Sequence, residues 1–270
     1  MTPAIPVAIH GAAGRMGQSI LRLLGERDDM SVVAAMVRAG SVLDGIAVPA
    51  GHPGLLHASS LHDDRHPQVL IDFSNAAAFD AALELAVRRR IAFVSGTTGI
   101  DARQRAALDR AAATIPVLWS ANFSLGIALL SRLVAQAAKA LPDWDCEIAE
   151  AHHSAKEDAP SGTALVLGRE VAAARGEDFD VVAHLSRAGS DTARAPSEIG
   201  FAVTRAGDIV GEHTVVFATQ GERIELVHRA TDRDIFARSA LAAARWMAGR
   251  SAGRYTLSDV VGIDPAGASA

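Results

Sequence analysis

The sequence predicts an α/β protein with a doubly wound parallel sheet and a second domain of the α+β type. Between residues 7 and 119, short apolar runs alternate with helical patterns. Strands that are apolar on both faces and alternate with helices are typical of a parallel sheet covered by helices on both sides. Beyond residue 180, strand-like runs follow one another without intervening helices, which indicates a separate domain.

Composition limits the class of protein. The 270 residues are enough for one large or two modest domains, and 49% hydrophobic with 21% charged residues is typical of a globular protein. The net charge of -5, without a basic run beyond Arg88–Arg90, predicts no nucleic-acid partner.

Cysteine content and hydropathy indicate the compartment. The single cysteine, Cys146, excludes an internal disulfide and fits a reducing environment, where we expect it to be a small core residue. The N-terminus lacks the charged and apolar regions of a signal peptide. The longest apolar segment, residues 123–141, contains charged and polar residues and predicts a buried helix rather than a membrane span. We therefore expect a soluble, cytoplasmic protein without a membrane partner.

The first strand, Val7–His10, ends in a glycine-rich turn, and a helical pattern follows to a stop at Gly25. This order is what a Rossmann-type dinucleotide-binding turn requires. The turn spans Gly11–Gly17 with the spacing GxxGxxG instead of the common GxGxxG. Its glycines still suit a tight turn, a close backbone approach to a pyrophosphate and close helix packing, so we predict nucleotide binding. The alternative is a turn with a structural role alone.

The residues that follow the second strand, Ser31–Val37, bear on the choice of cofactor. A unit that binds NAD usually has a carboxylate about 20 residues beyond the glycines, where it bonds the ribose hydroxyls. This sequence has Val37 and Arg38 there, and Arg38, together with Arg15, would attract the 2′-phosphate of NADPH. We expect NADPH to be accepted at least as well as NADH. The alternative is that Arg38 is a solvated surface charge.

Residues 40–67 show no clear pattern, and we expect a solvated loop there. The segment contains four histidines, of which His62 and His66 would share one face of a helix. Neither a cysteine nor a fixed ligand spacing accompanies them, so we predict no metal site. The roles of His52 and His57 stay open.

The alternation of strand and helix then resumes. The expected strands are residues 69–73, 91–94 and 115–119, and the expected helices are residues 76–90 and 101–113, the latter with Asp101 as N-cap. Ligands of such sheets bind at the carboxyl ends of strands. The turns Gly96-Thr97-Thr98 and Ala121-Asn122-Phe123 lie there and can line a nicotinamide, although either turn taken singly is better explained as a plain connection.

The pattern changes after a long helix at residues 124–141. We expect a strand at 145–152, a helix at 163–174 and, at 181–185, 199–205, 213–219 and 223–229, further strands of an antiparallel or mixed sheet. A final helix, residues 234–248, is expected to pack back on the first domain. The predicted dinucleotide-binding domain thus comprises residues 1–122 and 234–270, and residues 123–233 form the second domain.

A lysine beside two adjacent histidines indicates proton transfer. His152 and His153 can exchange a proton near neutral pH, and Lys156 can do so when it is partly desolvated. Among the 26 Lys and Arg residues, only Lys139 and Lys156 are lysines. Arginine stays charged at physiological pH, so a site that needs a proton donor would keep a lysine. The alternative is a solvated loop charge.

The residues that follow predict an anion site. Pro160 precedes Ser161, Gly162 and Thr163, which open an apolar run. Proline followed by small polar residues and helix formers predicts a helix start, whose free N–H groups attract anions. We therefore predict a site for an acidic small molecule that also receives a proton.

Five motifs of the sequence occur together in one known family. They are GxxGRMG at residues 11–17, GTTG at 96–99, ANFS at 121–124, EAHHxxKxDAPSGTA at 150–164 and RAGDIVGEH at 205–213. Together they resemble the 4-hydroxy-tetrahydrodipicolinate reductases, also called dihydrodipicolinate reductases. The resemblance runs from Val7 to about Val260, and its most specific motif is the one at 150–164.

The resemblance implies a reductase that acts on a cyclic, dicarboxylated imine-type intermediate with NADH or NADPH, in the diaminopimelate route to lysine. It also implies a cytoplasmic homotetramer assembled through the sheet of the second domain. Members that use NADH strongly tend to have an acid where this chain has Val37, which favours NADPH here.

The resemblance further implies roles for individual residues. His152 would be the proton donor and acceptor and Lys156 the proton donor; which of the two delivers the proton stays open. The substrate would be bound by His153, Lys156, Ser161, Gly162 and Thr163. The pyrophosphate and the nicotinamide would be held by Gly11, Ala12, Ala13, Gly14, Arg15, Met16, Gly96, Thr97, Thr98, Ala121, Asn122 and Phe123.

Two other functions stay open. One is a different NAD(P)-dependent dehydrogenase on a similar scaffold, acting on an amino acid or a semialdehyde. The other is a catalytically silent regulator that binds a dinucleotide. The regulator would need the glycine turn but not the cluster of His152, His153 and Lys156.

Overall fold

The chain divides into two compact units. The computed structural model describes residues 3–49, 51–189 and 193–262. The first unit consists of the residues up to Ser124 together with Asp234–Val260, and the second contains Leu125–Arg233. The division after Ser124 lies close to the domain boundary predicted from the sequence.

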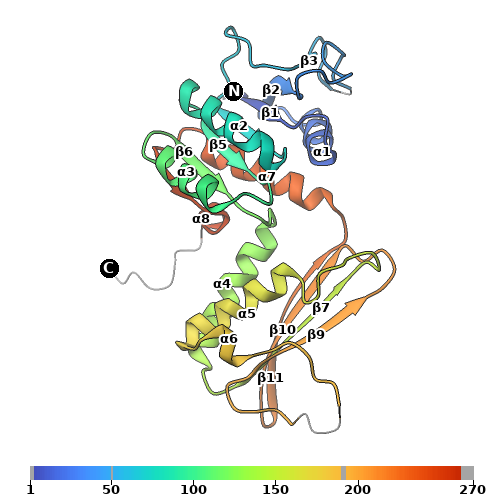
Figure 1. Cartoon of the computed structure of the whole chain (residues 1–270), viewed down its shortest axis with the longest axis vertical. Coiled ribbons are helices and arrows are strands. Elements are labelled where there is room, and N and C mark those ends of the chain that lie inside the picture. The colour runs from blue at the N-terminus through green and yellow to red at the C-terminus, as the bar shows by residue number, and fades with distance from the viewer. Residues whose placement is uncertain (1–2, 50, 190–192, 263–270) are drawn as a thin grey trace. The chain divides into compact units, whose positions relative to one another are not determined.

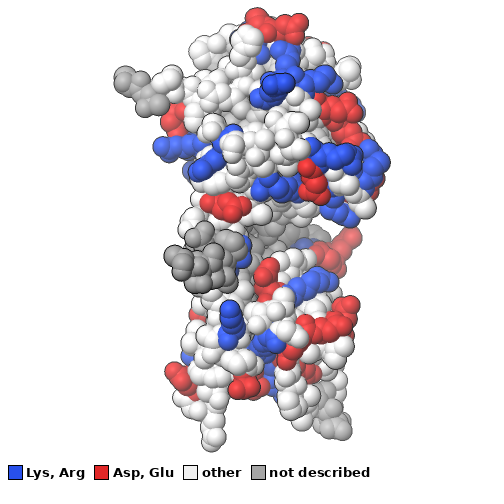
Figure 2. Space-filling model, turned by 90° about the vertical axis from the view of Figure 1, so that its left-hand side faces the viewer, with Lys and Arg blue, Asp and Glu red and all other residues white. Residues whose placement is uncertain are grey.

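The surface carries charges of both signs. Figure 2 shows Lys and Arg side chains interspersed with Asp and Glu over the face that it displays.

Among the described residues, no helix has the length and hydropathy of a membrane span. The long helix predicted at 124–141 runs from Leu125 to Ala140 and buries one side against the second unit's core.

The first unit contains a sheet whose described strands are all parallel. These strands are β1 (Ile5–His10), β2 (Met30–Met36), β3 (His57–Ala58), β4 (Val69–Asp72), β5 (Ala92–Ser95), β6 (Pro116–Trp119) and β12 (Gly253–Tyr255). Their order is β12-β6-β5-β4-β1-β2-β3, so the chain order reverses at β1, between β4 and β2. Ligands of parallel sheets bind beyond the carboxyl ends of the strands at such a switch point.

Helices cover both faces of this sheet (Figure 1). They are α1 (Arg15–Leu24), α2 (Ala76–Arg89), α3 (Ala102–Ala112), α7 (Asp234–Met247) and the short α8 (Leu257–Val261). Leu70 and Phe93 of the sheet form one buried cluster with Phe79 of α2 and Leu108 of α3. Successive strand residues point to opposite faces, so the equally buried Ile71 points away from this cluster, toward the face that α1 and α7 cover.

Local signals in the sequence explain where two of these helices begin. Asp101 is the N-cap of α3, as predicted: its carboxylate accepts the N–H of Gln104 at 2.7 Å, and the Gln104 side chain accepts the N–H of Asp101 at 3.0 Å. Helix α7 belongs to the first unit. Asp234 at its start accepts hydrogen bonds from Ser19 and Arg22 of α1.

The second unit contains a mixed sheet with its helices on one face (Figure 1). The strands are β7 (Asp145–His152), β8 (Ala183–His184), β9 (Ile199–Arg205), β10 (Gly211–Thr219) and β11 (Glu222–Ala230), and the helices are α4 (Leu125–Ala140), α5 (Gly162–Arg175) and α6 (Phe179–Val182). The order is β11-β10-β7-β9-β8. Strand β10 pairs antiparallel with both β7 and β11, whereas β9 pairs parallel with both β7 and β8.

Strand alternation builds the core of the second unit and then its polar end. Cys146 and Ile148 of β7 point toward α4 and α5 and are fully buried. Two and four residues further along the same strand, Glu150 and His152 are buried on that face as well. The next strand repeats the pattern, because His213 continues the buried face of β10. The sheet face that packs against α4 and α5 is therefore apolar at one end and carries ionisable side chains at the other.

Two expectations about local structure were wrong. The predicted strand at 181–185 is instead the helical turn α6 followed by the two-residue strand β8. Asp178 caps that turn by accepting the N–H of Asp180 at 3.0 Å, and this local bond favours a helix start over an extended chain. Residues 40–67 are not simply a solvated loop, because β3 lies within them and buries His57.

Candidate active site

The glycine turn lies at the carboxyl end of β1. Gly11 has a φ of +80°, and a Cβ at this position would lie 2.7 Å from the carbonyl oxygen of Phe73. A Cβ at Gly17 would collide with the carbonyl of Gly11. Both positions thus require glycine, the first for its backbone conformation and the second for the close packing of α1 on the turn.

The start of α1 fits an anion. Gly14 is the N-cap and has no side chain to bond the free N–H groups of the first helical turn. Ala13, Gly14 and Arg15 are exposed, whereas Ala12 is fully buried and donates its N–H to the carbonyl of Met36 at 3.0 Å. Exposed N–H groups beside glycine, at the positive end of a helix dipole, are the features that hold a dinucleotide pyrophosphate.

A buried carboxylate joins the turns at the ends of β1, β4 and β5. Asp72 is fully buried and accepts hydrogen bonds from the hydroxyls of Ser95 at 2.8 Å and Thr97 at 2.7 Å. Its other oxygen lies 2.7 Å from Nδ1 of His10 and 3.3 Å from the backbone nitrogen of Ser74. Burial alone would raise the pKa of Asp72, but these bonds and the charge of His10 bring it below its usual value.

The two turns predicted to hold the nicotinamide lie on this same edge. Gly96 packs directly under the Phe73 ring, where a Cβ would collide with it. Phe123 is buried edge-on against Phe73, with ring centroids 5.2 Å apart. Trp119 donates its indole N–H to the carbonyl of Thr97 at 2.8 Å. These aromatic contacts hold both turns in place. Of the residues predicted to line the nicotinamide, Thr98 and Ala121 are exposed.

Two exposed arginines lie near this edge. Arg15 begins α1, and Arg38 follows β2 by two residues. Both are exposed, and within the described part of the chain neither takes part in an ion pair. Their guanidinium groups are therefore available to a phosphate.

The second cluster, in the second unit, is centred on Glu150. Its buried carboxylate accepts both guanidinium Nη groups of Arg205 at 2.8 Å, the backbone N–H of Ser161 at 2.9 Å and Nδ1–H of His152 at 2.6 Å. Burial would raise the pKa of Glu150, but the bonds from Arg205, His152 and Ser161 hold it below its usual value. The group is therefore a carboxylate anion at neutral pH.

The second ring nitrogen of His152, Nε2, faces Gly211 of β10. A Cβ at Gly211 would lie 3.1 Å from Nε2 of His152, so the glycine keeps this side of the ring free of a side chain. The His152 side chain is 11% exposed. The imidazole is thus bonded to Glu150 at Nδ1, and position 211 places no side chain against Nε2.

Lys156 and His153 lie on the segment between β7 and α5. Nζ of Lys156 pairs with Oδ1 of Asp158 at 2.6 Å, and this bond holds the pKa of Asp158 below its usual value. His153 is half-buried, and its carbonyl accepts the N–H of Lys156 at 3.1 Å. Of the predicted cluster, the structure thus brings His152 to the buried carboxylate and Lys156 to an exposed one.

The predicted helix start is confirmed. Ser161 is the N-cap of α5, and its hydroxyl accepts the N–H of Ala164 at 3.2 Å. Gly162 is exposed, and a Cβ there would meet nothing within 4 Å, while Thr163 is half-buried. The positive end of the α5 dipole thus lies beside Glu150, and the exposed Asp158 accepts the N–H of Gly162 there.

His213 is a buried histidine of this cluster that the sequence did not single out. Nε2 of its ring lies 3.2 Å from the Ser161 hydroxyl, and its ring packs edge-on against His152 with centroids 5.2 Å apart. Burial lowers the pKa of His213 to about 4, and the nearby charge of His152 acts in the same direction. His213 is therefore neutral in the folded protein at physiological pH.

Four further residues were missed as members of a site: Asp72, His10, Glu150 and Arg205. Asp72 ends an otherwise apolar strand at the ligand-binding edge, which is a usable signal. Glu150 continues the alternation of Cys146 and Ile148 onto the buried face, which also points to it. No local signal connects Arg205 to Glu150, because the two are 55 residues apart.

The four histidines of residues 52–66 form no cluster. Nε2 of His52 lies 2.7 Å from the carbonyl of Leu21, and Nδ1 of His57 lies 3.1 Å from that of Ile46. His62 and His66 are exposed and lie outside any helix. Among the described residues, no group of His, Cys, Asp and Glu is arranged to hold a metal ion.

Comparison with known families covers both units. Residues 5–123 match the family model described as "Dihydrodipicolinate reductase, N-terminus", and residues 126–261 match "Dihydrodipicolinate reductase, C-terminus". The chain belongs to the dihydrodipicolinate reductase family. The resemblance drawn from the five sequence motifs is confirmed.

Relatives of this family match the chain over almost its whole length. The 4-hydroxy-tetrahydrodipicolinate reductase of Stenotrophomonas maltophilia (strain K279a) is 49% identical over 257 residues, covering 94% of this chain and 96% of the relative. That of Parvibaculum lavamentivorans is 44% identical over 273 residues, covering 98% and 100%. A dipicolinate-bound dihydrodipicolinate reductase from Paenisporosarcina sp. TG-14 has the same fold, with a TM-score of 0.75 at 22% identity over 94% and 97% of the two chains.

The buried neutral His213 predicts how stability depends on pH. When unfolded, it takes up a proton below about pH 6.5, but when folded it does so only near pH 4. Because the unfolded state binds more protons between these values, stability falls as the pH falls. From pH 6.5 to 5 the free energy of unfolding should drop by about 1.5 kcal/mol. Urea titrations at each pH measure this drop.

The variant His213→Gln should lose most of this dependence, because glutamine does not titrate. The matched control is His184→Gln, which changes a partly exposed histidine of the same unit. The groups that face His213 are Glu150, His152, Lys156 and His228, and they are unchanged in both variants. An unaltered pH dependence in His213→Gln would show that another group is responsible.

Proposed function

We propose that the protein catalyses the nicotinamide-dependent reduction of 4-hydroxy-tetrahydrodipicolinate to tetrahydrodipicolinate, in the diaminopimelate route to lysine. The observation that carries this proposal is the cluster at the start of α5. A buried Glu150 orients His152, the start of α5 lies next to both, and Lys156 is on the intervening segment. Relatives at 44–49% identity carry the corresponding name.

The first unit supplies a site that fits a nicotinamide dinucleotide. The turn from Gly11 to Met16 can hold the pyrophosphate through backbone N–H groups, and the edge around Thr97 and Ala121–Phe123 can hold the nicotinamide. When bound, the nicotinamide would supply the hydride. The residues of the chain bind and orient it and do not themselves carry out redox chemistry.

The second unit supplies groups that can deliver a proton. Loss of the substrate's 4-hydroxyl group as water gives a conjugated imine, and hydride addition to this imine leaves an electron-rich carbon that must be protonated. His152 can do this from Nε2, because Nδ1 is bonded to Glu150. Lys156 can do it from Nζ after exchanging its bond with Asp158 for one with the substrate. Both remain candidates for the donor.

The same unit supplies partners for two carboxylates. The start of α5 at Gly162 and Thr163 attracts one anion, which would take the place that Asp158 holds at the Gly162 N–H. A second carboxylate of the substrate can replace Asp158 as the partner of Lys156. The Asp158 side chain is exposed, so it can turn into solvent when the substrate binds. His153 on the same segment adds a further donor. We accordingly assign substrate binding to residues 123–233.

Location and assembly belong to the same proposal. We propose a cytoplasmic homotetramer that assembles through the sheet of the second unit. The face of this sheet away from α4 and α5 supports it, because the apolar Ala149, Ala202 and Val227 are exposed there. Apolar side chains on one sheet face are typical of a surface that a second copy covers.

The reaction itself is the first test. Purified protein supplied with freshly generated 4-hydroxy-tetrahydrodipicolinate should consume NADPH, followed as the loss of its absorbance. Amino acids with oxidised cofactor, and semialdehydes, are the controls for the other dehydrogenase function. A response to either control without a response to the dicarboxylate would contradict the proposal, and cofactor binding without turnover would favour the regulator.

The variant Lys156→Arg tests the proton donor. Arginine keeps the charge and can still pair with Asp158, so the KM for the substrate should stay near the wild-type value. Arginine cannot give up its proton, so kcat should fall at least about tenfold. Lys139→Arg is the matched control, because it makes the same change at the exposed end of α4. Full kcat in Lys156→Arg would remove Lys156 from the donor role.

Cofactor preference tests Arg38. We propose that NADPH is used at least as well as NADH, because Arg38 and Arg15 can bond the 2′-phosphate. In Arg38→Ala, kcat/KM for NADPH should fall roughly tenfold while that for NADH changes little, as expected for one lost charge-assisted bond. Arg88→Ala changes an exposed arginine of α2 and serves as control. A large preference of the wild type for NADH would refute the assignment.

A further inference from the structure

We infer that Glu150 is a positioning residue, which fixes the ring of His152 and, through Arg205, anchors the segment that carries Lys156. The inference rests on the proposed function and adds a cause for the geometry of its proton-transfer groups. One carboxylate would thus set the orientation of both candidate donors.

The first part of the argument is the direction of the bond between Glu150 and His152. Glu150 has a lowered pKa and is ionised, so its oxygens can only accept hydrogen bonds. Nδ1 of His152, 2.6 Å from Oε2, must therefore carry the proton. The neutral ring is then the Nδ1–H tautomer, and its lone pair is at Nε2, on the side that faces Gly211, where no side chain covers it. Such a ring can receive a proton and hand it on at Nε2 alone.

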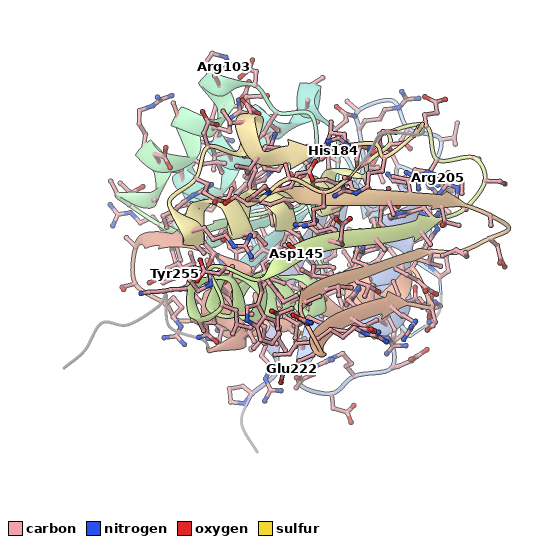
Figure 3. All side chains as sticks on the ribbon, turned by 90° about the horizontal axis from the view of Figure 1, so that it is seen from below. Arg103, Asp145, His184, Arg205, Glu222 and Tyr255 are labelled. Atoms are coloured by element: carbon pink, nitrogen blue, oxygen red, sulfur yellow. The ribbon has the colours of Figure 1, made fainter. Side chains whose placement is uncertain are left out.

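The second part is the position of Arg205. Its side chain lies at the end of β9, at the opposite end of the sheet from Asp145 (Figure 3). Besides its two bonds to Glu150, Nη2 donates to the carbonyl of Asp158 at 2.6 Å, and Nε donates to that of Lys156 at 3.3 Å. The guanidinium thereby ties the Lys156 segment to the carboxylate that holds His152.

The third part is the cost of the arrangement. A buried ion pair often stabilises a protein no better than apolar residues of similar size, because both charges lose their hydration. Breaking such a pair is nevertheless costly, so loss of stability alone would not distinguish a positioning role from a structural one. The discriminating quantities are the His152 tautomer and the division of effects between kcat and KM.

Two variants separate the two functions of the carboxylate. Glu150→Gln removes the charge that requires a proton on Nδ1 of His152. Arg205→Lys keeps a positive charge beside Glu150 but cannot make the bidentate bond and both carbonyl bonds. The matched controls are Glu147→Gln and Arg187→Lys, because these residues form a partly exposed Glu–Arg ion pair with each other near the start of β7.

The expected results differ for the two variants. In Glu150→Gln, kcat should fall at least about tenfold while the KM for NADPH stays within about twofold, because the cofactor residues lie in the other unit. In Arg205→Lys, the KM for the dicarboxylate should rise at least about tenfold with a smaller change in kcat. Both control variants should keep wild-type values.

Nitrogen NMR of histidine-labelled protein reads the tautomer directly. At about pH 8.5, two units above the ordinary histidine pKa, wild-type His152 should show the Nδ1–H pattern. Its signal is assigned from its absence in His152→Gln. In Glu150→Gln, the signal should shift toward the Nε2–H tautomer, which predominates in free histidine, whereas in Arg205→Lys it should stay as in the wild type.

Each outcome decides the question. A folded Glu150→Gln with full kcat and an unchanged tautomer would overturn the positioning role, while the proposed function would stand on wild-type activity. If the wild type does not reduce the dicarboxylate, the proposed function fails, and the tautomer still tests the geometry. If Glu150→Gln does not fold, the wild-type spectrum decides, because an Nε2–H signal for His152 would refute the inference.

Discussion

The constraint on which the second unit depends is a carboxylate placed inside its core. Glu150 occupies a position that alternation along β7 assigns to an apolar side chain, and a charge there is tolerated only if every lone pair is matched. Donors therefore converge on it from β7, α5 and β9, in the form of His152, the Ser161 N–H and Arg205. Satisfying one buried charge thus determines the arrangement of three elements and of the segment between them.

The first unit uses the same physical device at its sheet edge. Asp72 is buried as deeply as Glu150. It accepts hydrogen bonds from two hydroxyls, a backbone N–H and His10, at the carboxyl ends of β1, β4 and β5. In both units an ionised side chain connects loops that hydrophobic packing could not hold in a fixed geometry, because loops bury little apolar surface. The apolar cores position the strands, and the buried carboxylates position the ends of the strands.

Much of the fold followed from periodicity, since long amphipathic helices and buried strands leave a strong pattern. The helix starts at Asp101 and Ser161 were also predictable, because capping depends on residues three positions apart. Short elements such as β3 and β12 were not, because two or three residues carry no period and owe their pairing to the neighbouring strand. The same limit applies to the site: Lys156 was conspicuous, whereas Arg205 depends on a contact that only the folded chain creates.

The alternation along β7 has a consequence for how the protein tolerates change. Successive residues of a strand face opposite ways, so inserting a single residue between Ile148 and Glu150 would rotate Glu150 and His152 to the face away from α5. The core residues before the insertion would stay in place, and the sheet could still pair. The spacing within this strand is therefore under the same constraint as the identity of its charged residues, and an insertion or deletion there would separate folding from activity.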